Sequence, residues 1–366
     1  MPRPLESALP VWYITLSSDG EENEMEKRTK NTLRSIKEVH RVDGVRTGEL
    51  EKYIHGIPPT AMSTDDDERH RRGLGRLASL VSHLMALESI AKHFASTASL
   101  HVDPLAVVVQ DDFSLEFAQW WGRVGVPFDS FMADAPPDWQ MLQLAPVADS
   151  ALWRELDRAP IGLNVTRLTA RWSSLVAPAG LGCYAVRAST AMYFTRTFLR
   201  HRRWDVLPYF ADAQRRVDLA AVYPEMFLFS RAVAFTALTS PVSYHVEGSW
   251  FQRGRTHNDL HSEICARAML GARWRLWAAT QLVGPNASED REDGDPDPNG
   301  SAVITSRMLV SQLTRQRVNE CFNTQERFRL NDATAQRLME HLKRNLTGLR
   351  FFDRSFARKL SRRRLA

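Results

Sequence analysis

Short apolar runs rich in β-branched and aromatic residues alternate along this chain with segments of helical periodicity. The runs predict strands over 11–16, 39–45, 105–109, 138–144, 183–186 and 242–246. The periodic segments predict helices over 21–36, 73–94, 188–203 and 218–237. Residues 54–72, with two prolines and a basic cluster, are expected to form a surface loop. Strands that alternate with helices favour a parallel sheet, so the pattern predicts an α/β fold.

Two adjacent carboxylates, Asp111 and Asp112, follow the most apolar of these strands. Ionised carboxylates are too costly for a strand core without partners, so we expect both at the strand end, facing a crevice. In open α/β sheets, ligands bind in the crevice beyond the carboxyl ends of the strands. Paired oxygen ligands there suit Mg²⁺ or Mn²⁺. The alternative is a turn in which one of the two aspartates caps the segment that follows.

Composition and charge divide the chain into three parts. The 366 residues are 43% hydrophobic and 25% charged, as in ordinary globular proteins. Residues 284–300 form an acidic linker rich in Pro and Gly, which separates a predicted main domain (1–283) from a basic helical extension (301–366). The extension holds 15 Lys and Arg against 5 Asp and Glu, whereas the whole chain has a net charge of only +5. The rest of the chain is therefore acidic.

The basic extension has three interpretations, which we rank in this order. It docks as a solvated helix on the acidic main domain, it rests on an anionic membrane surface, or it binds nucleic acid through phosphates. Three widely spaced cysteines favour a reducing compartment over a disulfide framework. No apolar run approaches the ~20 residues of a membrane span, and no signal peptide is recognisable. We expect a cytoplasmic protein, with membrane association through the extension as the alternative.

Other motifs exclude some classes of chemistry. No Gly-x-x-x-x-Gly-Lys loop or Gly-x-Ser-x-Gly elbow is present, so neither P-loop nucleotide hydrolysis nor esterase chemistry is supported. His257 and His261 have a zinc-compatible spacing but lack the glutamate of zinc proteases, so we interpret them as surface residues. His83 lies at the margin of the apolar stripe of its helix, where it is either a packed residue or a neighbour of a strand end.

Read in order, seven segments resemble glycosyltransferase family 25, the lipopolysaccharide and procollagen galactosyltransferase-like enzymes. They are VWYITL at 11–16, VDGV at 42–45, LVSHLMAL at 80–87, VVVQDDF at 107–113, the strand at 138–144, GCYAVRASTA at 182–191 and Val217-Asp218. The resemblance implies a GT-A fold, in which a Rossmann-like, mixed, mainly parallel sheet flanked by helices binds a nucleotide sugar and usually Mn²⁺. It therefore implies transfer of a hexose such as galactose or glucose, from a donor that we expect to be UDP-linked, to a glycan, lipid-linked or protein hydroxyl.

The resemblance also implies roles for individual residues. Asp111, Asp112 and His245 are the expected ligands of Mn²⁺ or Mg²⁺. An inverting transferase needs a carboxylate to take the acceptor proton, and the candidates are Asp218, which matches the family better, and Glu225. The expected donor site consists of Thr15, Asp43, Ser82, His83, Gly182 and Tyr184.

Two departures from the family keep other functions open. Gln110 stands where the family has Glu before the aspartate pair, so one potential metal ligand is neutral. Arg76 stands where the family commonly has Glu before the Ser-His helix. One alternative is therefore a nucleotide-sugar-binding protein on the GT-A fold with weak or no catalysis. Another is a nucleic-acid- or membrane-binding protein that acts through its basic extension.

Overall fold

A computed structural model gives the structure of part of the chain. It describes residues 7–16, 24–56, 67–95, 102–115, 128–133, 135–147, 172–173, 180–209, 211, 223–244 and 270. Except for 238–241 and 270, these residues belong to one compact unit built from 1–147, 172–237 and 242–250. The predicted linker and basic extension lie outside the described residues.

Seven of the described strands form one sheet, in the order β2-β1-β3-β7-β5-β10-β6. Their bounds are β1 Val11–Thr15, β2 Val39–Asp43, β3 Leu105–Gln110, β5 Met141–Gln143, β6 Trp172–Ser173, β7 Cys183–Arg187 and β10 Ala234–Ala237. Strands β2, β1, β3, β5 and β10 run in one direction, while β7 and β6 run antiparallel to their neighbours. The prediction of a mixed, mainly parallel sheet in an α/β fold is confirmed.

The topology of the sheet marks a place for a ligand. After β1 the chain moves to β2 on one side and then returns to β3 on the other, and both neighbours are parallel to β1. The order of the strands therefore reverses at β1, and ligands of open α/β sheets bind beyond the carboxyl ends of strands at such a switch point. Because β7 is antiparallel to β3, its first residues lie at this same carboxyl edge.

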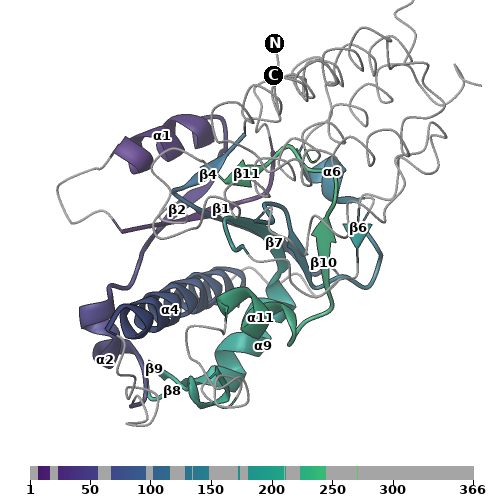
Figure 1. Cartoon of the computed structure of the whole chain (residues 1–366). Helices are drawn as coiled ribbons and strands as arrows, with labels where there is room; N and C mark the ends of the chain where they lie inside the picture. Colours follow the sequence, from purple (N-terminus) through teal and green to yellow (C-terminus); the bar gives the residue numbers. More distant parts are fainter. Residues whose placement is uncertain are drawn as a thin grey trace, which may run out of the picture. The chain divides into compact units, whose positions relative to one another are not determined.

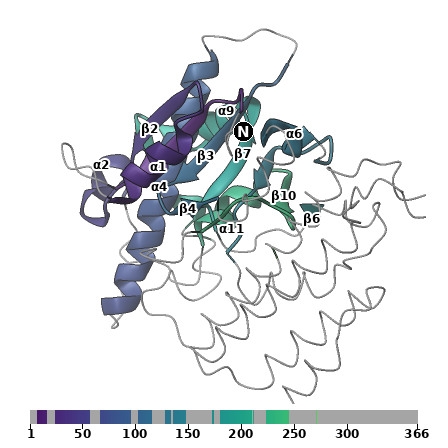
Figure 2. The same cartoon turned by 90° about the horizontal axis from the view of Figure 1, so that it is seen from above.

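Helices cover both faces of the sheet (Figure 1). Helix α1 (Glu24–Leu33) lies on one face, and α4 (Asp67–Ala95), α9 (Ala188–Phe198) and α11 (Pro224–Phe229) lie on the other. The view from above agrees, with α1 in front of the strands and α4 behind them (Figure 2). Shorter helical segments of the described unit include η1 Thr47–Glu49, α2 Leu50–Tyr53 and α6 Phe128–Ala133. No described helix has the length and apolarity that crossing a membrane requires.

The main core lies between the sheet and α4, α9 and α11. Alternate residues of β1 and β3, such as Trp12 and Val108, face this core because side chains of a strand point to opposite faces in turn. Leu84 and Leu87 of α4 are completely buried against them, as the predicted apolar stripe requires. Consequently Tyr13, Thr15 and Asp111 belong to the face of α1, while Gln110 belongs to the face of α4.

Three predicted elements differ from those observed. Helix α4 begins at Asp67, so the end of the expected loop over 54–72 is helical. The sequence from 60 to 72 contains no proline, so nothing in it prevents the helix from beginning before Gly73. The helix predicted to Arg203 ends at Phe198, because His201 and Arg202 have positive φ angles in the turn between β8 (Leu199–Arg200) and β9 (Arg203–Trp204).

The third difference is the helix predicted over 218–237. Within its described part, 223–237, α11 starts at Pro224, where a missing N–H costs nothing, and ends at Phe229. Ala234–Ala237 is strand β10, which pairs with β5. The run is only four residues long and mostly apolar, and such a run carries no periodicity that separates a strand from a helix. The pairing with β5, and not the local sequence pattern, makes this segment a strand.

Candidate functional site

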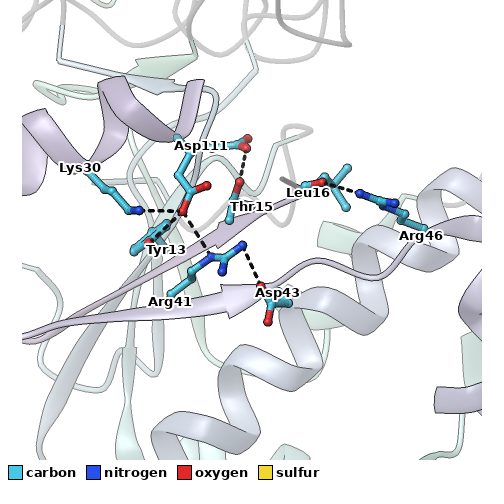
Figure 3. Close-up of polar contacts among 9 residues, drawn as sticks. Tyr13, Thr15, Leu16, Lys30, Arg41, Asp43, Arg46 and Asp111 are labelled. Carbon is cyan, nitrogen blue, oxygen red and sulfur yellow. Dashed lines mark hydrogen bonds and ion pairs between the residues drawn. The ribbon is translucent and has the colours of Figure 1, made fainter. Parts of the chain in front are cut away.

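The carboxyl ends of β1 and β3 are joined by a side-chain hydrogen bond. Thr15, the last residue of β1, donates its hydroxyl proton to Oδ2 of Asp111 at 2.9 Å, as Figure 3 shows. From α1, Arg28 Nη2 and Thr29 Oγ1 donate to the main-chain oxygen of Asp111 at 3.0 and 3.1 Å. We call Thr15, Arg28, Asp111 and Asp112 the switch-point cluster.

The carboxylates of this cluster are in an environment that disfavours negative charge. Burial raises the pKa of Asp111, although the Thr15 hydroxyl, the Leu16 amide and the charge of Arg28 act in the opposite direction. Asp112 is only 2% exposed. Burial lowers the pKa of Arg28, and the negative charges of Asp112 and Asp111 act in the opposite direction. Further positive charge beside Asp111 would therefore favour the ionised form of its carboxylate.

A buried glutamate, Glu26, connects α1 to the strands beside the switch-point cluster. Its Oε1 accepts a hydrogen bond from the Tyr13 hydroxyl at 3.2 Å and forms ion pairs with Lys30 and Arg41, both at 3.2 Å (Figure 3). Glu26 lies in the first turn of α1 and does not present its carboxylate to solvent. Its negative charge nevertheless adds to the rise of the Asp111 pKa.

Asp43, a predicted donor-site residue, ends β2 directly opposite Thr15. Its exposed carboxylate pairs with Arg41 Nη2 at 3.1 Å. The next residue, Gly44, donates its N–H to the Thr15 carbonyl at 2.7 Å. A Cβ on Gly44 would lie 2.7 Å from Cδ2 of Leu16 and 3.1 Å from the Thr15 oxygen, so a side chain here would displace the Leu16 side chain and crowd the strand end; the close approach favours glycine.

On the other face of the sheet, three side chains form a buried polar chain. Gln110 Nε2 lies 3.0 Å from His83 Nε2, and His83 Nδ1 lies 3.2 Å from the Tyr184 hydroxyl. Burial lowers the pKa of His83 to about 3 and raises that of Tyr184. The imidazole is therefore neutral at physiological pH, and with the Gln110 amide donating to Nε2 it carries its proton on Nδ1. A neutral glutamine suits this neutral histidine.

The glycine loop before β7 is held from several sides. Gly180, at φ 119°, donates its N–H to Glu225 Oε1 at 2.8 Å, and its carbonyl accepts the Gln143 side-chain amide at 2.7 Å. The Gly182 carbonyl accepts the Gln110 main-chain N–H at 2.9 Å. Glu225 is only 5% exposed. Two predicted site residues therefore help to hold this loop at the carboxyl edge: Gly182 from within the loop and Glu225 from α11.

An arginine two helical turns before His83 lies beyond this edge. Arg76 is about 10 Å before His83 along α4, and its guanidinium lies over the Tyr223 ring, 4.0 Å from the centroid. Its Nη1 is buried and has no hydrogen-bond partner within the part of the chain that the structure describes. Burial raises the pKa of Tyr209, on which the charges of Arg76 and Glu225 act in opposite directions. Arg76, Tyr209 and Glu225 are therefore neighbours.

The remaining predicted residues have different outcomes. Ser82 is 4% exposed; its hydroxyl accepts the Val45 N–H and donates to the Ala78 carbonyl, both at 2.8 Å, so its contacts hold the turn after β2 to α4. Asp218 and His245 lie outside the described residues. His245 follows β11 (Ser243–Tyr244), whose Tyr244 pairs antiparallel with Phe113 of β4 (Phe113–Ser114), the residue after Asp112.

Arg28 of the switch-point cluster and the buried Glu26 were not predicted. They belong to a polar helix whose few apolar positions do not by themselves tell which charged residue faces the sheet. A usable signal was the spacing of Glu26, Thr29 and Leu33, the three residues that α1 buries, since i, i+3 and i+7 share one face.

Comparison of the chain with protein-family models and with curated proteins finds no match in either. The likeness to glycosyltransferase family 25 therefore rests on the seven short sequence segments alone.

Proposed function

We propose that this chain is a glycosyltransferase of the GT-A type that takes a hexose from a nucleotide-sugar donor, UDP-linked in our preferred assignment. One observation carries the proposal: the hydrogen bond between Thr15 and Asp111 at the switch point of the sheet, with Asp112 next along the chain and Arg28 beside both. This is where open α/β sheets bind ligands, and it combines carboxylates with a cation. The acceptor is a hydroxyl group of a glycan, lipid-linked or protein substrate.

The residues fit a divalent cation such as Mn²⁺ or Mg²⁺. Asp111 and Asp112 offer hard oxygen donors where burial disfavours their negative charge, so a bound cation would offset an existing electrostatic cost. His245 is the proposed additional ligand. When bound, the ion would neutralise the charge that develops on the leaving diphosphate. Gln110 contributes nothing to this set through its amide nitrogen, which contacts His83 on the opposite face.

The chain supplies its own cations for the diphosphate. Arg28 is held beside the two aspartates, and Arg76 offers a buried donor that an anionic oxygen could satisfy. Charge-assisted bonds from arginine to phosphate are strong and directional, so both side chains would orient the donor. The Gly180–Gly182 loop, held by Glu225 and Gln143, would keep the neighbouring wall of the site rigid.

For the acceptor, the chemistry requires a carboxylate that takes the hydroxyl proton as the glycosidic bond breaks. Glu225 accepts the Gly180 N–H and is almost fully buried, which suits a positioning role. We therefore assign the base to Asp218 and treat Glu225 as its support. Replacement of Asp218 by Asn should then abolish transfer while nucleotide binding survives.

A second candidate function is nucleotide-sugar binding with little or no catalysis. It is favoured by Gln110, which replaces a carboxylate with a neutral amide and is committed to His83. Without a third carboxylate the site would hold a divalent cation more weakly.

Both candidates can be tested with one set of measurements on the full chain. Thermal shifts with UDP and several UDP-hexoses, with and without Mn²⁺, measure binding, because a ligand of the native state raises its stability. Release of UDP with and without a sugar acceptor measures turnover. Metal-dependent turnover supports the transferase, and metal-independent binding without turnover supports the binding protein. Absence of both binding and turnover would refute the two together.

A further inference from the structure

A second polar cluster lies at the opposite, amino edge of the sheet. It consists of Glu38, the residue before β2, His40 within β2, and His93 in the last turn of α4. His93 is ten residues beyond His83 on the same helix, about 15 Å along its axis. The cluster is therefore separate from the proposed donor site.

The three side chains present their ligating atoms to one another. Glu38 Oε1 lies 2.9 Å from His40 Nε2 and 3.3 Å from His93 Nε2, and the three ligating atoms lie within 4.8 Å of one another. Around a tetrahedral Zn²⁺ with bonds of about 2.0–2.2 Å, neighbouring ligand atoms are about 3.3 Å apart. Both nitrogen–oxygen separations are thus close to an edge of such a tetrahedron.

Aromatic packing holds the two imidazoles in this orientation. Trp12 stacks on His40 with ring centroids 4.4 Å apart and planes 16° apart, and it meets His93 edge to face at 5.5 Å. The indole of Trp12 is itself fixed, because its N–H donates to Ser89 of α4 at 2.9 Å. His93 also packs edge to face on Phe94. Such packing lowers the entropic cost of gathering ligands around an ion.

We propose that Glu38, His40 and His93 form a binding site for a divalent transition metal of the zinc class, with its fourth position open to water. Two imidazoles with one carboxylate suit Zn²⁺, Co²⁺ or Ni²⁺, whereas Mg²⁺ prefers oxygen ligands alone. The side chains are 45%, 33% and 27% exposed in the order Glu38, His40, His93, so an ion can enter from solvent. Bound there, it would tie the start of β2 to the end of α4.

The test uses the full chain after treatment with a chelator. Zn²⁺ should raise the melting temperature saturably, Mg²⁺ should not, and Co²⁺ should show the intense visible absorption of a four-coordinate ion. In His40→Gln and His93→Gln, Zn²⁺ affinity should fall at least about 10- to 100-fold, the range found even for residues that only support a ligand. His55→Gln is the matched control, since His55 contacts the Arg200 carbonyl and not this cluster.

Glu38→Gln keeps the test informative if a histidine variant folds poorly, because Glu38 is the most exposed of the three and packs against no ring in the described contacts. It too should weaken Zn²⁺ binding while the protein keeps its metal-free melting temperature. The proposal is overturned if the wild-type chain shows no saturable Zn²⁺ binding. It is equally overturned if the double variant His40→Gln/His93→Gln binds Zn²⁺ as the wild type does, because the ion then binds elsewhere. None of these readouts depends on sugar transfer.

Discussion

The two edges of the central sheet hold polar clusters that are built in different ways. At the carboxyl edge, the side chains of Asp111, Asp112 and His83 are largely buried and are engaged by other elements of the fold. At the amino edge, Glu38 and two histidines are partly exposed. Glu38 Oε1 contacts the Nε2 atoms of both His40 and His93. Burial shifts pKa values at the first edge, whereas aromatic stacking orients the rings at the second.

The difference indicates two kinds of ligand. Buried carboxylates cost stability unless positive charge compensates them, so this edge suits a divalent cation bound together with a substrate that brings many contacts. A small, open set of three ligating atoms suits a single ion that needs few.

The largest expected effect is that of Asp112→Asn. The variant keeps the shape of the buried side chain and removes its charge, so we expect transfer to fall by at least about 100- to 1,000-fold while the fold remains. UDP release with Mn²⁺ and the melting temperature of the same preparation measure both effects. Turnover within a few-fold of the wild type would remove Asp112 from the mechanism.

A carboxylate at the amino edge provides the control. Asp103 lies outside the start of β3, where its two oxygens accept the N–H and hydroxyl of Ser189 in the first turn of α9. Asp103→Asn should cost at most about 1 kcal/mol of stability, as for the loss of a helix cap, and leave transfer unchanged. If both aspartate variants lost activity equally, the effect would be one of folding and not of the carboxyl edge.

The next effect concerns acid stability and His83. The pKa of about 3 in the folded state is below the ordinary value of 6.5, so between these pH values the unfolded chain binds a proton that the folded chain does not. The free energy of unfolding should therefore fall as pH falls from 6.5 toward 3, by about 1.4 kcal/mol per pH unit from this residue alone. His83→Gln should flatten this dependence, as measured by urea unfolding at several pH values. Parallel pH dependences for the two proteins would show that His83 is not buried in its neutral form.

The sequence predicted the α/β class and the position of Asp111 after a strand, but not the contacts of the side chains at the carboxyl edge. Alternating apolar strands and helices determine the α/β class, and the cost of burying charge predicts that Asp111 follows a strand end. It did not reveal that Gln110 and Asp111 face opposite sides of the sheet with different partners, because those partners, His83 and Thr15, are 27 and 96 residues away in the chain. Likewise, Ala234–Ala237 became a strand through pairing with β5, which no local pattern encodes.

The smallest effect comes from comparing two arginines that both lie over aromatic rings. Arg231 lies over Phe227, 3.8 Å from the ring centroid, and donates to the Phe227 carbonyl at 2.9 Å, whereas Arg76 lies over Tyr223 with a buried Nη1 that finds no acceptor among the described residues. Replacement by Met removes a cation–π contact in each case. Arg231→Met should also lose about 1 kcal/mol through its hydrogen bonds to the Phe227 carbonyl and the Ser230 hydroxyl, and leave UDP binding unchanged.

Arg76→Met should behave in the opposite way. It removes no hydrogen bond among those that the described residues show, so its stability should lie above that of Arg231→Met. Its Kd for UDP should rise about 10- to 100-fold through loss of a charge-assisted contact. Calorimetric titration of UDP and urea unfolding of both variants measure the two effects. Equal UDP affinity in the two variants would make Arg76 a packing residue and leave Arg28 as the proposed cation of the donor site.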